Sequence, residues 1–333
     1  MTLQEQRPTI SVVIPVHNAA HLVERVFAPV LAALQRQEID EILVVDDCST
    51  DQLMEQLANY PCIKTVRTAQ LSGPGAARNL AAQQATGEIL WFVDSDVIVA
   101  DDSARVLGGS FSDPNTVAVM GCYDDAPAAP NFLSQYKNLV HHFYHHHAKA
   151  EASTFWAGCG AVRKSAFLAV GGFDSKTYKF PSIEDIDLGY RLRAAGGRIL
   201  LDKSIQSQHL KVWRLGNLLH TEIFRRAIPW SKLMLRRGTL TDDLNIGRAE
   251  RLRAVLVILL LIATLLALTG RASWWMPGAL LALDVIANRT FLSFFFKARG
   301  FWFMARAYVM HRAYYLYSSA AFASAWLTVK LGA

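Results

Sequence analysis

The chain has 333 residues, 52% of them apolar, and its mean hydropathy of +0.19 is high for a purely soluble enzyme. The formal net charge is +6, and Lys and Arg cluster at 236–253 and 297–312 beside apolar runs, which indicates contact with anionic lipid headgroups and excludes a nucleic-acid-binding pattern. The four cysteines show no CxxC pair, which excludes a metal-finger protein.

The first hundred residues alternate predicted strands and helices. Short β-branched runs predict buried strands, and helical spacing of Leu and Val predicts the segments between them. The predicted strands are Ile10–Val16, the run 41–51 that ends in an acidic pair, Ile63–Arg67 and the run 87–96; helices are expected at 20–36, around 53–57 and at 72–87. This alternation predicts an α/β domain with a mostly parallel sheet and helices on both faces.

Asp94, Ser95 and Asp96 close the last of these strands. Carboxylates at the carboxyl end of a strand lie where open α/β sheets bind ligands. Two of them, one residue apart on a turn, can hold a hard divalent cation, and such a cation neutralises a diphosphate leaving group. From the residues alone a second interpretation stays open, because Asp-x-Asp also occurs by chance at turns and helix caps.

A second acidic cluster, Glu184-Asp185-Ile186-Asp187, begins a predicted helix about ninety residues later. Its carboxylates therefore lie near a helix amino terminus. A diphosphate held by a metal and a separate carboxylate base are what a nucleotide-sugar transferase needs.

Motifs in one order extend this pattern over nearly two hundred residues. They are IPVHN, VVDDCSTD, GPGAARN, FVDSD, WAGCGAVRKSAFLAVGGFD and EDIDLGYRL. With them, residues 10–200 resemble a membrane-anchored, inverting family 2 glycosyltransferase. The resemblance implies the GT-A nucleotide-sugar-binding fold, which is Rossmann-like, and we place this catalytic domain at residues 1–245.

The resemblance also implies the donor-binding residues. They are Pro15, His17, Asp47, Gly73, Arg78, Asp94, Ser95 and Trp156. Asp47 would accept a hydrogen bond from the nucleotide base, or else cap a helix. Arg78 would bind the nucleotide or its phosphates, and the alternative is a solvated helix residue. Trp156 would stack on a sugar or pack in the core.

The same resemblance implies the metal ligands and the base. Asp96 would bind Mg²⁺ or Mn²⁺ directly, Asp94 would contact the ribose or a metal-bound water, and His209 would be a third ligand unless it is a surface histidine. Asp185 would be the general base, with Glu184 in a supporting role. The His-rich stretch 141–147 is expected on an amphipathic helix over 131–151 that faces lipid headgroups or an anionic acceptor.

The last part of the chain, 246–333, is predicted to be a membrane domain. The uncharged run 254–270 predicts one transmembrane helix, 272–296 a weaker second and 313–329 a third. The basic segment 297–312 is expected along the membrane interface. The distribution of Lys and Arg predicts a multi-pass protein of the cell (inner) membrane with its catalytic domain on the cytoplasmic side, and the polar start of the chain lacks a signal-peptide core.

The sequence therefore predicts a metal-dependent, inverting glycosyltransferase that moves a sugar from a UDP- or GDP-sugar to a lipid-linked or glycan acceptor at the membrane. Nucleic acid is not an expected partner. A processive polysaccharide synthase is an alternative, although 211–230 lacks the Gln-x-x-Arg-Trp motif of those enzymes. A non-catalytic nucleotide-sugar-binding membrane protein is the alternative of another class.

Overall fold

The computed structural model describes residues 7–238, 242 and 244–332, and it divides into two compact units, Met1–Trp213 and Arg214–Ala333. This division comes earlier than the expected end of the catalytic domain at residue 245. The reason is packing: the π-helix Thr221–Ala227 and α9 (Ile228–Arg237) lie against α13 (Phe301–Lys330) of the second unit.

A mixed sheet forms the centre of the first unit, and among the described residues it has nine strands in the order β3-β2-β1-β4-β8-β6-β9-β5, with β7 beside β9. The strands are β1 Ile10–Val16, β2 Glu41–Asp46, β3 Ile63–Arg67, β4 Ile89–Val93, β5 Val97–Val99, β6 Thr116–Tyr123, β7 Glu151–Ala152, β8 Cys159–Arg163 and β9 Arg198–His209. Strands β1 to β4 pair in parallel, and so do β6 and β9. The predicted mostly parallel α/β sheet is confirmed, with β5, β7 and β8 as its antiparallel members.

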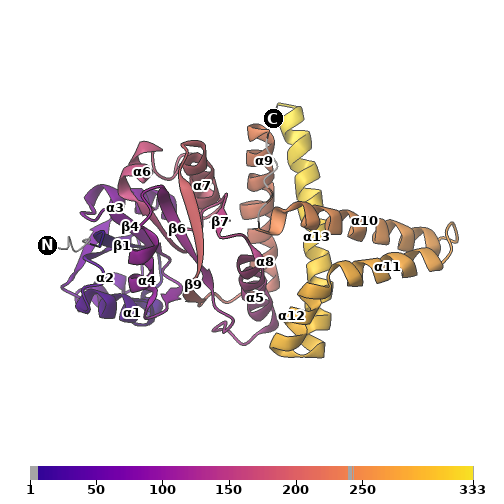
Figure 1. Cartoon of the computed structure of the whole chain (residues 1–333), viewed down its shortest axis with the longest axis horizontal. Helices are drawn as coiled ribbons and strands as arrows, with labels where there is room; N and C mark the ends of the chain where they lie inside the picture. The colour runs from indigo at the N-terminus through magenta and orange to yellow at the C-terminus, as the bar shows by residue number, and fades with distance from the viewer. Residues whose placement is uncertain (1–6, 239–241, 243, 333) are drawn as a thin grey trace. The chain divides into compact units, whose positions relative to one another are not determined.

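Helices cover both faces of this sheet, as Figure 1 shows. They are α1 Val23–Gln35, α2 Leu53–Leu57, α3 Pro74–Gln84, α4 Ser103–Ser110, α5 Phe132–His147, α6 Lys164–Ala169 and α7 Glu184–Ala194. Alternate residues of β1 point to opposite sides: Val12 and Ile14 pack with α1 and α4, whereas Val13 packs with α3, α6 and α7. The sheet thereby forms two cores and leaves its carboxyl edge for polar side chains.

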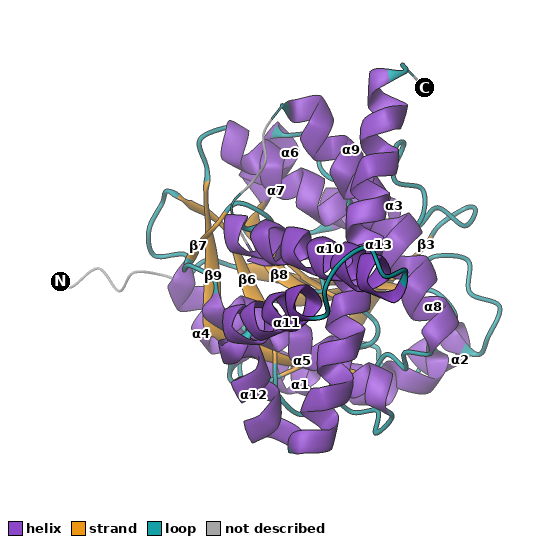
Figure 2. Cartoon of the chain, turned by 90° about the vertical axis from the view of Figure 1, so that its right-hand side faces the viewer, coloured by secondary structure: helices purple, strands orange, loops and turns teal. Residues whose placement is uncertain are grey.

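The second unit consists of helices among its described residues. After α8 (Leu215–His220) and α9 come the 3₁₀ turn Leu244–Ile246, α10 (Arg248–Leu268), α11 (Trp275–Ala287), α12 (Arg289–Arg299) and α13, drawn in purple in Figure 2. Among the helices described, α10 alone is long and apolar enough to cross a membrane, and α11 with α12 would be a second candidate only if counted as one span.

The structure changes two of the predicted spans. Residues 272–296 do not form one helix, because the chain bends by 66° between α11 and α12, next to Asn288. Residues 313–329 are not a separate element but belong to the 30-residue α13, together with most of the expected interfacial segment 297–312. The tyrosines and serines of 313–329 dilute its hydropathy, so that uncharged composition overstated its similarity to a span.

Candidate active site

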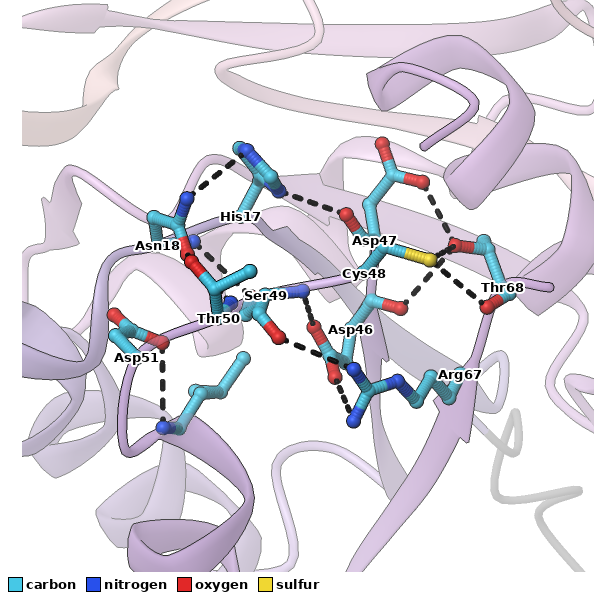
Figure 3. A network of polar contacts seen from close by, with 11 residues as sticks. His17, Asn18, Asp46, Asp47, Cys48, Ser49, Thr50, Asp51, Arg67 and Thr68 are labelled. Carbon is cyan, nitrogen blue, oxygen red and sulfur yellow. Dashed lines mark hydrogen bonds and ion pairs between the residues drawn. The ribbon is translucent and has the colours of Figure 1, made fainter. Parts of the chain in front are cut away.

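The ends of β1 and β2 form a polar network that Figure 3 shows. His17, directly after β1, donates its Nδ1–H to the carbonyl oxygen of Asp47 at 2.7 Å, which leaves Nε2 as an acceptor for the side-chain amide of Asn18 at 3.2 Å. Pro15 lies one residue before the end of β1, beyond Val13, where the pairing with β4 stops. The parallel sheet thus brings Pro15, His17 and Asp47 to one edge, as predicted.

Asp47 holds the loop that leads into α3. Its Oδ1 accepts hydrogen bonds from the hydroxyl of Thr68 and the amide of Ser72, both at 2.8 Å, and its Oδ2 accepts one from the amide of Gly73 at 2.7 Å. Each carboxylate oxygen has two lone pairs, so Oδ2 keeps one for a further donor. The carboxylate therefore organises the protein itself and retains limited capacity for a nucleotide base.

Asp46 acts as a local cap in the same turn. The amide of Ser49 donates to its Oδ1 at 2.7 Å, and Arg67 lies 3.4 Å from its Oδ2. Asp46 therefore caps the turn and Asp47 holds the loop before α3, whereas a contact of Asp47 with a nucleotide base stays a prediction.

Gly73 is required by geometry at that loop. Its φ of +83° is a left-handed conformation, and a Cβ there would lie 2.3 Å from the carbonyl oxygen of Lys179. The loop before α3 and the segment before α7 are consequently in backbone contact at this glycine.

Arg78 lies in the first half of α3 and contacts both acidic clusters. Its guanidinium lies 2.5 Å from Asp94 and 3.5 Å from Glu184, and it is 5.3 Å from the ring centre of Phe173. Burial opposes the charge, but the carboxylates outweigh it and hold the pKa of Arg78 above its ordinary value. The alternative of a solvated helix residue is wrong, because Arg78 is only 3% exposed. A phosphate contact of this side chain stays a prediction.

Glu184 and Asp185 begin α7, as predicted. Glu184 is buried, and this burial, with the nearby charge of Asp185, raises the pKa of Glu184 to about 7 against the opposing charge of Arg78. Asp185 is half-buried, and the amide of Ala157 donates to its Oδ2 at 3.2 Å. The two adjacent carboxyl groups therefore lie in different environments, one buried and one half-buried.

Asp96 and His209 lie close together although they are far apart in the sequence. Val97, next to Asp96, is the strand partner of His209, and 112 positions separate that pair. The antiparallel pairing of Val97 with His209 places the ring beside the β4–β5 turn, and Nε2 lies 3.4 Å from Asp96 Oδ2. His209 is 9% exposed, so it is not a surface histidine. Burial alone would raise the pKa of Asp96, but His209 outweighs it and holds that pKa below its ordinary value.

Asn138 and Tyr123 orient the His209 ring, and sequence reasoning missed both. The Nδ1–H of His209 points to Asn138 Oδ1 at 3.0 Å, and the ring stacks on Tyr123 with centroids 4.7 Å apart. A ring so held presents Nε2 to Asp96: a protonated Nε2 pairs with the carboxylate, and a neutral ring in the same orientation could share a metal ion with it. The donor set of one carboxylate and one imidazole suits Mn²⁺ or Mg²⁺ together with diphosphate oxygens.

The predicted three-residue metal set is not assembled within the residues that the structure describes, where no group of three His, Cys, Asp or Glu could hold an ion. Asp94 instead turns to Arg78, while Asp96 turns to His209. Ser95 lies between them, half-buried, in the turn. A full coordination shell there would include oxygens that the protein does not supply.

Trp156 is half-buried and lies in an aromatic cluster beside this pair. Its ring packs edge-on against Tyr123 at 4.6 Å and against His145 at 5.7 Å, and it covers Gly158, where a Cβ would be 2.6 Å from the indole. Both expected roles, packing and a sugar-facing wall, remain compatible with its exposure.

The His-rich stretch lies on α5, as predicted, and its histidines have separate surroundings. His142 donates its Nδ1–H to the carbonyl oxygen of Tyr123, whereas those of His146 and His147 point to carbonyl oxygens one turn earlier in the helix. His145 faces Trp156. Only one side of the histidine stretch therefore belongs to the candidate site.

Residues 11–171 match the family model described as Glycosyl transferase family 2, and residues 137–212 match the N-terminal domain of galactosyltransferase. These matches cover the sheet and every candidate site residue. They support a family 2 glycosyltransferase. The glycosyltransferase domain so defined ends one residue before the first compact unit does.

Characterised relatives match parts of this domain. The poly(ribitol-phosphate) beta-N-acetylglucosaminyltransferase TarS of Staphylococcus aureus is 38% identical over 103 residues, 28% of this chain and 17% of the relative. The validoxylamine A glucosyltransferase of Streptomyces hygroscopicus is 27% identical over 223 residues, 57% of this chain and 52% of the relative. The chain thus matches between 17% and 52% of the length of these two relatives.

Solved structures share the fold. The mannosyltransferase PcManGT of Pyrobaculum calidifontis, in complex with GDP-Man and Mn²⁺, superposes with a TM-score of 0.64 at 20% identity over 96% of this chain and 88% of that chain. TarS residues 1–349 with UDP give a TM-score of 0.51 at 17% identity, over 98% of this chain and 92% of that one. The GT-A-like α/β fold of the glycosyltransferase domain is confirmed.

Proposed function

We propose that the chain is an inverting glycosyltransferase that moves a sugar from a nucleotide-diphosphate sugar to a lipid-linked or glycan acceptor at the membrane. One observation carries the proposal. Within a family 2 domain, Arg78 draws Asp94 and Glu184 together, so the carboxyl end of β4 and the start of α7 converge on one site. The donor-side carboxylates and the base candidate Asp185 then lie on two sides of one reaction centre.

The nucleotide of the donor would bind at the edge formed by β1 and β2. The nucleotide base would lie against Pro15, His17 and Asp47 Oδ2, which has one lone pair left to accept a hydrogen bond. The ordered Ser72–Gly73 loop would approach the phosphates. The structural relatives contain GDP-Man or UDP, which favours a GDP- or UDP-sugar as donor.

A divalent metal, Mg²⁺ or Mn²⁺, would be held by Asp96 and His209, with Asp94 contributing to the ribose or through water. When bound, it supplies positive charge to the diphosphate leaving group. The chain's own contribution is to orient the ligands: Asn138 and Tyr123 fix the imidazole, and the β4–β5 turn fixes the carboxylate. The Mn²⁺ in the PcManGT complex supports this assignment.

Asp185 would remove the proton of the acceptor hydroxyl while its oxygen attacks the anomeric carbon. Direct displacement of the nucleotide diphosphate from the opposite face inverts that carbon. Glu184, whose pKa is raised to about 7 by burial and by the nearby charge of Asp185, would serve as a hydrogen-bonding support beside Arg78. Trp156 would line the sugar side of the site.

We further propose that the chain resides in the cell (inner) membrane with the glycosyltransferase domain on the cytoplasmic side. Support comes from α10, the apolar helix that is long enough to span, and from the basic residues that precede it. An acceptor on a lipid carrier in the cytoplasmic leaflet would then reach the site without leaving the membrane.

A panel of UDP- and GDP-sugars tests this function. Titration calorimetry with the purified full chain, with and without Mn²⁺, should detect one donor class with metal-dependent affinity. NMR of the product should give an anomeric configuration opposite to that of the donor. A chain that binds a donor but neither hydrolyses nor transfers its sugar would be a non-catalytic binding protein, and retention of configuration would refute the inverting mechanism.

A further inference from the structure

In the second unit, α10 and α11 form a helical hairpin. The two helices pack together and are joined by residues 269–274. Figure 1 shows them projecting from the rest of this unit, whereas α9 and α13 run alongside one another. At the open end of the hairpin, the Nε–H of Arg253 donates to the carbonyl oxygen of Ala287 at 3.1 Å. We call this end the base and residues 269–274 the tip.

The hairpin exposes apolar side chains over most of its surface. Only 17% of the apolar window of α10 is buried. On α10, apolar side chains between 37% and 65% exposed are Val255, Leu259, Leu261, Ile262, Leu265, Leu266 and Leu268; on α11, those between 41% and 56% exposed are Leu281, Leu283, Val285 and Ile286. Leaving so much apolar area in water costs about 25 cal/mol per Å², so apolar surroundings would stabilise the hairpin.

Both ends of the hairpin are suited to a water interface. The base carries Arg248, Arg251 and Arg253, and the tip carries Arg271 with the exposed Trp274 and Trp275. Tryptophan concentrates at membrane interfaces, and arginine at the bilayer centre is costly. A tip with this composition belongs at the far interface, not in the middle of the lipid.

The length of α10 fits a crossing, whereas α11 alone is shorter than the full hydrocarbon core. The uncharged run 254–270 extends about 25 Å as a helix, against a hydrocarbon core of about 30 Å. Helix α11 is shorter, about 20 Å for its 13 residues. Local thinning of the bilayer compensates such a mismatch at a fraction of a kcal/mol per Å.

Among the described residues, polar contacts join helix α13 to the hairpin near its base. The hydroxyl of Tyr308 donates to the fully buried Asp284 at 2.5 Å, Arg312 lies 3.4 Å from the same carboxylate, and Tyr315 donates to Glu250 of α10 at 2.5 Å. Over its later part α13 packs along α9, whose last turns are basic. A helix with these neighbours lacks the lipid-facing surroundings of a third span.

We infer that the described residues cross the membrane twice, through the α10–α11 hairpin alone, and that α13 stays on the side of the membrane where Gly247 begins the hairpin. The partner of the base is an anionic lipid surface, which attracts its arginines. This inference deepens the membrane location proposed above and rests on it. It replaces three crossings by two and thereby moves Leu331 from the outer side to the inner side.

Cysteine labelling in bacterial spheroplasts tests the inference. Cys48 and Cys62 are replaced by Ser, whereas Cys122 and Cys159 stay, because burial raises the pKa of both thiols to about 12 and makes them unreactive. Ser273→Cys reports the tip and Leu331→Cys, 80% exposed in the native side chain, reports the end of α13. A variant in which Cys48 is replaced but Cys62 is kept has Cys62 as its exposed thiol, and it is the matched reference for the glycosyltransferase domain.

A membrane-impermeant maleimide should label the Ser273→Cys variant in intact spheroplasts. Label should reach the Leu331→Cys variant, and the variant that retains Cys62, only after lysis. Labelling of Leu331→Cys in intact spheroplasts would show a third crossing and overturn the inference, and so would a Ser273→Cys tip that reacts only after lysis. Recovery of the chain in the soluble fraction would refute the membrane location itself, whereas sugar transfer, assayed on the same variants, tests the enzymatic function independently.

Discussion

At the scale of single residues, the raised pKa of Glu184 links the candidate site to stability. The pKa of Glu184 is about 7 in the folded chain, against an ordinary value of 4.5. The folded chain therefore holds this proton more tightly than the unfolded chain does, and the resulting contribution to the free energy of unfolding is lost as the pH rises through the folded pKa. We predict that Glu184→Gln, neutral at every pH, gains in melting temperature relative to the unmodified chain between pH 5 and pH 8. The gain in the free energy of unfolding is on the order of 2 kcal/mol.

Thermal denaturation across this pH range measures the difference. Glu88→Gln, at an exposed carboxyl group, is the control and should show a difference that does not depend on pH. A constant difference for Glu184→Gln as well would mean that Glu184 is ionised like any surface carboxylate.

Asp185 and its neighbour should separate binding from chemistry. We predict that Asp185→Asn binds the sugar nucleotide almost normally while kcat falls about 10²–10⁴-fold, because a general base acts only in the chemical step. Calorimetry and steady-state kinetics measure the two effects, with Asp102→Asn, an exposed carboxyl group on the surface, as the control. If Asp185→Asn transferred sugar at more than about a tenth of the normal rate, Asp185 would not be the general base, and Glu184 or Asp187 would be the next candidate.

Asn138 should act on metal affinity through His209. Removing the acceptor of the Nδ1–H frees the ring, so Asn138→Ala should weaken Mn²⁺ binding about 10- to 100-fold. Electron paramagnetic resonance of Mn²⁺ in the presence of UDP measures this without turnover. Asn138→Asp restores an acceptor and should restore the affinity; unchanged affinity in Asn138→Ala at a normal melting temperature would refute the positioning role.

At the scale of elements, the start of α3 depends on one glycine. We predict that Gly73→Ala destabilises the chain by about 1–3 kcal/mol, because it forces a Cβ into a left-handed conformation beside the carbonyl oxygen of Lys179. It should also weaken nucleotide binding, since the Gly73 amide that Asp47 holds would move. Gly109→Ala, in α4 with open space around the new methyl group, is the matched control and should stabilise by about 0.5–1 kcal/mol. Equal melting temperatures for the two variants would contradict the argument.

Elements with strong local patterns were predictable, and those made by long-range pairing were not. The strands β1 to β3 and the helices α3 and α7 follow from β-branched runs, a Gly-Pro turn and an acidic first turn. The three-residue β5 has no such signal, because its pairing with β9 creates it. For the same reason the sequence could place Asp96 and His209 in one site only through family resemblance, and it gave no sign of Asn138 or Tyr123.

At the scale of the whole molecule, composition predicted two parts but not where they divide. Residues 214–237 are as polar as the glycosyltransferase domain, yet they pack with α13, and hydropathy cannot register that preference. The bend beside Asn288 was equally hidden, because Asp284 and Asn288 look like defects in a span until Tyr308 and Arg312 are seen to pair with that carboxylate. Uncharged length marks candidate spans, whereas the packing partners of a helix become known only from the structure.

If the α10–α11 hairpin inserts as proposed, the contact between Asp284 and Arg312 would also order events during biosynthesis. Translation delivers α11 before α13, so the carboxylate of Asp284 leaves the ribosome ahead of the cation that neutralises it and of the Tyr308 hydroxyl that binds it. Until then, an uncompensated carboxylate on an apolar helix resists entering the lipid. The newborn α10–α11 pair would therefore pause at the membrane surface and insert as a unit once residues 308–312 arrive, which makes completion of the later helix the step that commits the chain to its final state.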